Sequence, residues 1–183
     1  RQVGWVGDDL KDISPHLYAD ADFGGDPDTQ RSTSGAHLQM EGPSTRFPII
    51  GRSVRQGCVS CSTPEAELVA GFMAHKNVLL PTFDLWDVLL PKGYRCSFHE
   101  DNQAMLRVCS TGKNPTMRHL NRVHRISVAW LHERLGNPAT KDPVDMVDTQ
   151  SDRMAADIYT KAFTDSDKWK DALHLINIVD PRR

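Results

Sequence analysis

The order of the predicted elements is typical of an α/β domain with a five-stranded mixed sheet and helices on both faces. Three strands come first along the 183-residue chain, and a helix, a strand, further helices, a fifth strand and a final helix follow. Alternating apolar and polar residues indicate the strands, and apolar residues at helical spacing indicate the helices. Mixtures of this kind are built as layers, with helices packed against a sheet.

The first predicted strand, at residues 17–23, is the one around which the chain is organised. Its polar positions are Tyr18, Asp20 and Asp22, and small or branched apolar residues alternate with them. Aspartate is depleted in strands and tolerated at their edges, so one interpretation is a solvated edge strand. The other is a strand that holds the carboxylate of Asp20 where a metal ion binds.

Four further strands follow from the same pattern. The second and third are predicted at 34–41 and 45–52, and Pro48 places the third at a sheet edge or at a bulge. The fourth, at 95–100, runs directly into Asp101, at the position where open α/β sheets place their sites. Asp101 is equally a candidate N-cap of the next helix. The fifth strand is predicted at 144–147.

The first helix has a clear start signal. Ser62 or Thr63 can cap it, Pro64 suits its first turn, and Glu67 lies near its N-terminus. Pro81 is expected to kink or end it. A long helix is predicted from 117 to 135, a further one contains Asp157, and an amphipathic helix ends the chain.

Charge and hydropathy limit the kind of protein that this can be. The net charge of −2 argues against binding of nucleic acid through bulk positive charge alone. Arg118, Arg122 and Arg125 share a face of the predicted 117–135 helix, and this face is either solvated or contacts phosphates. No apolar run is long enough to span a bilayer, so no membrane partner is expected.

The cysteines include a C-x-x-C pair, Cys58 and Cys61, which is typical of redox chemistry or of half a zinc site. The nearest histidine pair, His119 and His124, falls in the predicted long helix. We therefore expect the two thiols to be ordinary residues of a buried or half-buried strand. Reduced thiols are typical of an intracellular protein.

Four acids are predicted in settings that suit a metal ion. Asp20 lies in a strand, Glu67 and Asp157 lie in helices, and Asp101 ends a strand. Hard oxygen ligands on rigid elements favour Mg²⁺.

Six stretches, in order between residues 17 and 176, also match the motifs of a known family. They are YADADFGGD at 18–26, RSTSG at 31–35, STPEAE at 62–67, DNQA at 101–104, KNP and RHL within 113–120, and AADIYTK at 155–161. Together they resemble the ribonuclease H domain at the C-terminal end of the polyprotein of copia-type LTR retrotransposons.

The resemblance implies a ribonuclease H-like fold and an endoribonuclease that hydrolyses the RNA strand of RNA–DNA hybrids. It implies two Mg²⁺ ions, with Mn²⁺ as an alternative. The catalytic and metal-binding residues carried over are Asp20, Glu67, Asp101 and Asp157. Candidate contacts to nucleic acid are Lys113, Arg118, Arg122 and Arg125, with Arg52 and Arg55 as weaker ones. Asp22, Asp26 and Glu100 receive no metal role.

The same resemblance implies the context of the domain. Residues 1–15 form a lead-in or linker, 16–163 the catalytic domain, and 164–183 a C-terminal amphipathic helix. The expected partner is the reverse transcriptase domain of the same polyprotein, inside the cell, in a cytoplasmic retroelement particle or in the nucleus. The chain departs from the family at Asn121, where Asp is usual. Residues 148–152, the loop before the last acid, also lack the histidine that cellular relatives carry there.

Two alternatives belong to other classes. One is a decayed or repurposed module that binds nucleic acid or a polymerase without catalysis, although all four acids are present. The other is a transposase or integrase, whose acids run Asp, Asp, Glu, whereas here a Glu comes second and an Asp last.

Overall fold

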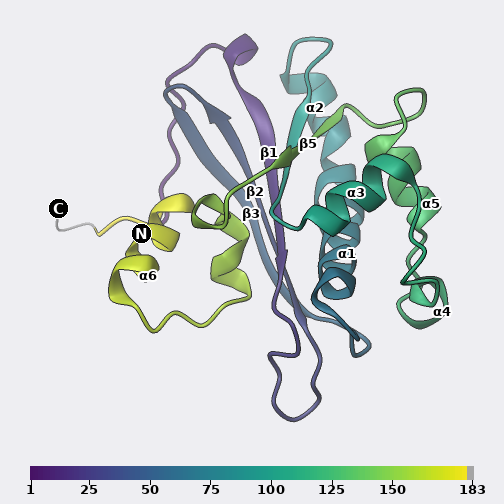
Figure 1. The fold of residues 1–183 in the computed structure, drawn as a ribbon. Coiled ribbons are helices and arrows are strands. Elements are labelled where there is room, and N and C mark those ends of the chain that lie inside the picture. The colour runs from purple at the N-terminus through teal and green to yellow at the C-terminus, as the bar shows by residue number, and fades with distance from the viewer. Residues whose placement is uncertain (181–183) are drawn as a thin grey trace.

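Five strands form one mixed sheet with the order β3-β2-β1-β4-β5. In this computed structural model, which describes residues 1–180, β1, β2 and β3 are antiparallel neighbours, and β4 and β5 run parallel to β1. The strands are β1 (Ser14–Ala21), β2 (Thr33–Gly42), β3 (Thr45–Arg55), β4 (Cys96–Glu100) and β5 (Val144–Asp148). The expected α/β architecture with a five-stranded mixed sheet is confirmed (Figure 1).

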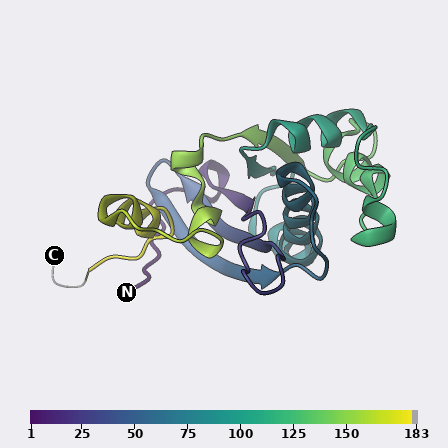
Figure 2. The ribbon, with the colours of Figure 1, turned by 60° about the horizontal axis from the view of Figure 1, so that its bottom comes forward.

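Helices cover both faces of the sheet. On the right-hand side in Figure 1 lie α1 (Thr63–Ala74), α2 (Phe83–Leu89), α3 (Gln103–Thr111), α4 (Leu120–Val123) and α5 (Val128–Leu131). Figure 2 shows the 3₁₀ helix η6 (Ala155–Tyr159) and α6 (Ser166–Leu175) on the side opposite to α1. Short 3₁₀ or π-helical segments lie at Leu10–Asp12, His75–Leu79, Leu80–Thr82, His132–Gly136 and Ser151–Arg153.

The first strand is central and buried on both faces. Leu17 and Ala19 pack in the main core with Leu68 of α1, whereas Tyr18 packs with Met154 on the opposite face. Its neighbours are β2 on one side and β4 on the other. The solvated-edge interpretation of this strand is therefore wrong, and the strand also begins earlier than predicted, at Ser14.

Pro48 and Ser62 have the structural roles that their residue types predict. β3 is an edge strand, and its pairing with β2 shifts register beside Pro48, as expected for a proline at an edge or bulge. Ser62 is the N-cap of α1, with its hydroxyl 3.4 Å from the backbone nitrogen of Glu65. The predicted end of this helix near Pro81 coincides with the short segments that connect α1 to α2.

The single long helix predicted from 117 to 135 is wrong. This stretch forms α4, α5 and a π-helical turn, and Arg125, between α4 and α5, has a φ of 57°. Leu120 and Ile126 are both fully buried, yet on one continuous helix they would lie about 120° apart around the axis. The chain breaks so that both can enter the core.

The predicted lead-in at 1–15 packs against the rest of the chain. Gln2 pairs with Ile178 and Trp5 with Arg46, so the two ends of the chain lie side by side. The last three residues of the predicted C-terminal segment, 181–183, lie outside the described residues. Within residues 1–180, no helix combines the length and apolar character that crossing a bilayer requires.

Candidate metal centre

Three carboxylates meet at one end of the two central parallel strands. Asp20 lies near the end of β1, Asp101 directly follows β4, and Glu67 projects from α1, which packs against β1 and β2. One oxygen from each lies within 4.8 Å of the others. Parallel strands bring their carboxyl ends to the same sheet edge, and this explains why acids so far apart in sequence converge.

Asp101 is not the cap of the following helix. Asn102 takes that role, since its side-chain oxygen accepts from the backbone N–H groups of Ala104 at 3.0 Å and Met105 at 3.2 Å. The N-cap interpretation of Asp101 is therefore wrong. The carboxylate of Asp101 is left to face Asp20 and Glu67.

Asp157 reaches this group through a lysine. It lies on the short 3₁₀ helix η6 rather than on the α-helix that was predicted. Lys161 Nζ is 2.8 Å from Asp157 Oδ1 and 3.3 Å from Asp20 Oδ1. The hydroxyl of Thr160 donates a hydrogen bond to Asp20 Oδ2. The three-carboxylate group thus gains a fourth acid at its border, bridged to Asp20 by an ammonium.

A glycine lets η6 come this close to the sheet. Gly35 of β2 is the register partner of Asp20, and a Cβ there would lie 2.7 Å from Thr160 Cγ2 and 2.9 Å from the carbonyl oxygen of Ala156. Any side chain at this position would therefore push η6 away from β1. The glycine of the RSTSG stretch sets the distance between Asp157 and Asp20.

Burial and neighbouring charges raise the pKa values of Glu67, Asp101 and Asp157. Burial, followed by the charges of Asp20 and Asp101, raises the pKa of Glu67 to about 9. Burial also raises the pKa of Asp101, with the charge of Asp20 as the next cause. The pKa of Asp157 rises to about 6, because burial and neighbouring acids outweigh the hydrogen bond from Lys161. In the metal-free protein, the carboxyl groups of the cluster are therefore not all ionised at neutral pH.

A divalent cation fits this group of side chains. Among residues 1–180, Lys161 is the one cationic side chain in ion-pair contact with Asp20 or Asp157. The buried Oε2 of Glu67 has no hydrogen-bond partner. Clustered carboxylates, one of them with an unpartnered oxygen, are the oxygen donors that Mg²⁺ prefers.

Sequence reasoning missed three residues around this group. Glu100, which received no role, is fully buried, and burial together with the charge of Glu67 raises its pKa well above the ordinary value. Thr160 and Lys161 contact Asp20 directly. The signal for Lys161 was available, because it lies four residues after Asp157 in the AADIYTK stretch.

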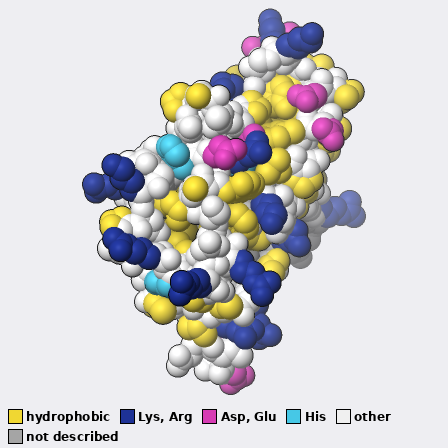
Figure 3. Space-filling view, turned by 90° about the vertical axis from the view of Figure 1, so that its right-hand side faces the viewer, with side chains coloured by type: hydrophobic (Ala, Val, Ile, Leu, Met, Phe, Trp, Pro, Cys, Tyr) yellow, Lys and Arg dark blue, Asp and Glu magenta, His cyan; other side chains and the backbone are white. Residues whose placement is uncertain are grey.

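The candidate nucleic-acid residues do not share one helical face. Arg118 precedes α4, Arg122 lies within it and Arg125 follows it, and all three are exposed. No Asp or Glu occurs between Asp101 and Glu133. On the face that carries α4 and α5, most Lys and Arg side chains gather in the lower half, as Figure 3 shows. The predicted helical stripe is therefore an exposed basic segment.

The remaining candidates lie apart from that segment in the sequence. Lys113 is exposed in the loop after α3. Arg52 and Arg55 are exposed on the edge strand β3, and Arg55 forms a 2.7 Å ion pair with Asp26. This pair leaves Arg55 less available to a phosphate than Arg52.

The C-x-x-C pair is not part of a strand. Cys58 and Cys61 lie in the loop between β3 and α1, where Cys61 is exposed, and all four cysteines are free thiols. The expectation that His119 and His124 lie in one long helix is also wrong, since they flank the short α4. Both imidazoles contact Glu65, whose carboxylate accepts from the backbone N–H of Cys61.

Comparison with solved structures agrees with the fold. One similar solved structure is that of LC11-RNase H1, isolated from compost by a metagenomic approach. The superposition covers 80% of this chain and 92% of the LC11-RNase H1 chain, with a TM-score of 0.52 and 14% sequence identity. At this identity the likeness shows that the two chains share a fold. Searches with protein-family models and against curated proteins gave no match.

Proposed function

We propose that the chain is a ribonuclease H that hydrolyses the RNA strand of RNA–DNA hybrids. One observation carries the proposal: the carboxylates of Asp20, Glu67 and Asp101 converge within 4.8 Å in a chain with the fold of a ribonuclease H1. The buried, unpartnered oxygen of Glu67 supports a cation-dependent reaction at this place. The six motif stretches support the same assignment of residues.

The metal-binding residues in this proposal are Asp20, Glu67, Asp101 and Asp157. Asp20 is central and would contact both ions, Glu67 and Asp101 would complete one site, and Asp157 the other. Two Mg²⁺ ions bound there would activate a water for attack and stabilise the leaving 3′ oxygen. Mn²⁺ would serve the same sites.

Lys161 has a separate role in the metal-free protein. Its ammonium balances the charges of Asp20 and Asp157 until a stronger cation arrives. Because a divalent ion binding Asp20 and Asp157 would compete with this ammonium, Lys161 would then be free to face a phosphate of the substrate. Thr160 would keep Asp20 oriented throughout, since its hydroxyl already donates to Oδ2.

The exposed basic segment would bind the backbone of the hybrid. Arg118, Arg122 and Arg125 lie in a stretch without acids, and Lys113 precedes it. Phosphate contacts of this kind position a duplex without reading its sequence. The enzyme would distinguish RNA from DNA by contacts to the 2′-hydroxyl.

The proposal extends to the context of a copia-type retroelement. The catalytic unit would span 16–163, preceded by the 1–15 segment and followed by the C-terminal helix, and would be tethered to a reverse transcriptase. A tether raises the effective concentration of the domain at the hybrid, so weak intrinsic affinity suffices.

The test is cleavage of a hybrid labelled on the RNA strand, with RNA–RNA and DNA–DNA duplexes of the same sequence as comparisons. Mg²⁺-dependent cleavage of the hybrid alone is expected, and Asp20→Asn should abolish it. Asp22→Asn is the matched control, because Asp22 lies on the same chain segment but bonds the backbone of Thr33 instead. Hybrid binding without cleavage by the wild type would favour the non-catalytic alternative.

A further inference from the structure

A second cluster of metal-ligating side chains surrounds Glu65, and it is separate from the carboxylate group of Asp20, Glu67 and Asp101. Glu65 lies in the first turn of α1, and its side chain is 1% exposed. His119 Nε2 lies 3.0 Å from Glu65 Oε2, and His124 Nε2 lies 2.7 Å from Oε1. The backbone N–H of Cys61 also donates to Oε2, at 3.2 Å. Two segments more than 50 residues apart thus meet at one buried carboxylate.

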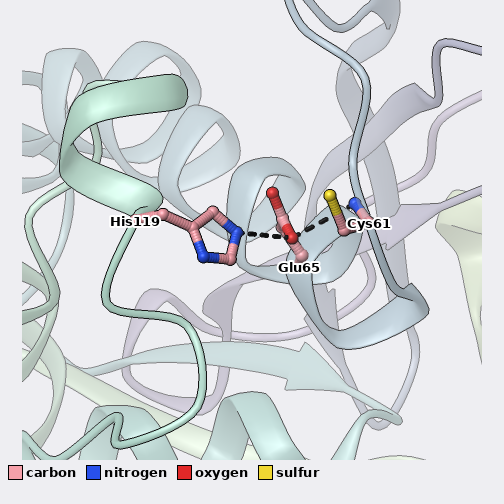
Figure 4. Close-up of side chains that lie close together, drawn as sticks. All are labelled: Cys61, Glu65 and His119. Atoms are coloured by element: carbon pink, nitrogen blue, oxygen red, sulfur yellow. Dashed lines mark hydrogen bonds and ion pairs between the residues drawn. The ribbon is translucent and has the colours of Figure 1, made fainter.

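The side chain of Cys61 completes a mixed donor set. Its Sγ, a Glu65 oxygen and a His119 imidazole nitrogen all lie within 4.8 Å of one another. Figure 4 shows Glu65 between His119 and the sulfur of Cys61. Zn²⁺ takes thiolate, imidazole and carboxylate ligands in a tetrahedron, which places the ligand atoms about 3–4 Å apart. The side chains of Cys61, which is exposed, and His119, which is 41% exposed, have room to move from the present spacing to that of a tetrahedral site.

We propose that Cys61, Glu65 and His119 bind a Zn²⁺ ion, with the fourth position open to water and His124 positioning the Glu65 carboxylate. Sulfur and imidazole nitrogen favour zinc over Mg²⁺, which prefers oxygen alone. The Glu65 carboxylate is held in place from three sides, by the two imidazoles and by the backbone N–H of Cys61.

The ion would join the exposed basic segment to the helix that carries Glu67. His119 lies between Arg118 and Arg122, and Glu65 is two residues before Glu67. The segment from 112 to 127 contains only the short helix α4, so few backbone hydrogen bonds hold it. Metal binding would fix the spacing between the arginines and the carboxylate cluster.

Cys58 is outside the donor set and provides the control. Its thiol donates to the carbonyl oxygen of Val123 at 3.2 Å, and its sulfur is not among the three grouped ligand atoms. A zinc site assembled from the C-x-x-C pair would need both cysteines, whereas the proposed site needs only Cys61. Substituting each cysteine separately therefore distinguishes the proposed site from a zinc site that uses both thiols of the C-x-x-C pair.

The experiment measures metal binding by the full chain under reducing conditions, independently of cleavage. Zn²⁺ content is measured after purification, and Co²⁺ titration reports on ligands through the thiolate-to-cobalt charge-transfer band. We expect one Zn²⁺ per chain and a charge-transfer band in the wild type and in Cys58→Ser. Cys61→Ser should lose the band and weaken Zn²⁺ binding at least 100-fold, about the upper end of the effect of an outer-shell change. His124→Asn should keep the band and weaken binding roughly 10–100-fold.

Asp20→Asn separates this site from the carboxylate cluster. The variant should keep the charge-transfer band, because carboxylates contribute no thiolate absorption. The proposal is overturned if wild type shows no band, if Cys61→Ser keeps the band or the Zn²⁺ affinity, or if Cys58→Ser loses them. If the wild type shows no band, Glu65, His119 and His124 form only a hydrogen-bonded cluster that connects α1 to the 119–124 segment.

Discussion

Glu67 makes the metal-free protein less stable as pH rises, and Glu67→Gln should remove this effect. The folded carboxyl has a pKa of about 9, against an ordinary value of 4.5 in the unfolded chain. Stability from such a group is fully present below pH 4.5 and is lost as pH rises toward 9, because the unfolded state releases the proton first. Between pH 4.5 and pH 7 the loss is about 3 kcal/mol, at about 1.4 kcal/mol per pH unit.

The assay is thermal unfolding of wild type and Glu67→Gln in the presence of a chelator, at pH 4.5 and pH 7. Titrating groups far from the cluster are common to both proteins, so the difference in Tm reports on Glu67 and on its coupling to neighbours such as Glu100. This difference should grow in favour of the variant by roughly 6–12 °C between the two pH values, at 2–4 °C per kcal/mol for a chain of this size. Glu133→Gln, at an exposed position, should behave like the wild type.

Adding Mg²⁺ at pH 7 should stabilise the wild type more than the variant. A cation that binds the ionised cluster stabilises the folded state by mass action, and the variant has lost one of its ligands. A Tm difference that is the same at pH 4.5 and pH 7 would refute the reasoning. It would mean that neither burial nor the neighbouring acids raise the pKa of Glu67.

Three other changes test the surroundings of this cluster. Lys161→Met should lower metal-free stability and enlarge the Tm increase on adding Mg²⁺, because the ammonium that bridges Asp20 and Asp157 is gone; an unchanged Mg²⁺ shift would contradict this. Gly35→Ala should destabilise the fold by about 1–3 kcal/mol in chemical unfolding and reduce cleavage, since the added methyl pushes η6 outward; Gly57→Ala, where nothing lies within 4 Å, is the control. Replacing Arg118, Arg122 and Arg125 together with Ala should lower the log–log salt slope of hybrid binding by about three, at about one per phosphate contact; an unchanged slope would make the basic segment a solvated surface.

Local signals in the sequence predicted most of the sheet and the helix starts. Ser62 and Pro64 mark the beginning of α1 because capping depends on residues within one turn. Pro48 predicted an edge strand or bulge because its missing N–H has the same consequence in any fold. The family resemblance named Asp20, Glu67 and Asp101 together, and the strand-end position of Asp101 gave independent support from the sequence.

What the sequence could not show depends on contacts between distant residues. The 117–135 stretch has helical periodicity, but burial of both Leu120 and Ile126 divides it. The pairing of Glu65 with His119 and His124 spans more than 50 residues and carries no local signal. The i, i+4 spacing signals the pairing of Lys161 with Asp157, but its contact with Asp20 depends on how closely η6 approaches Gly35 of another strand, and no local pattern shows that.

The central claim is that Asp20, Glu67, Asp101 and Asp157 hold the metal ions. Its most direct test is the anomalous diffraction of Mn²⁺ in crystals of the chain with a bound RNA–DNA hybrid. We expect two manganese peaks, about 3.5–4 Å apart, with Asp20 contacting both and Asp157 contacting one. Lys161 should then have left its position between Asp20 and Asp157. No manganese at Asp20, or peaks bound only by acids such as Asp22 and Asp26, would contradict it.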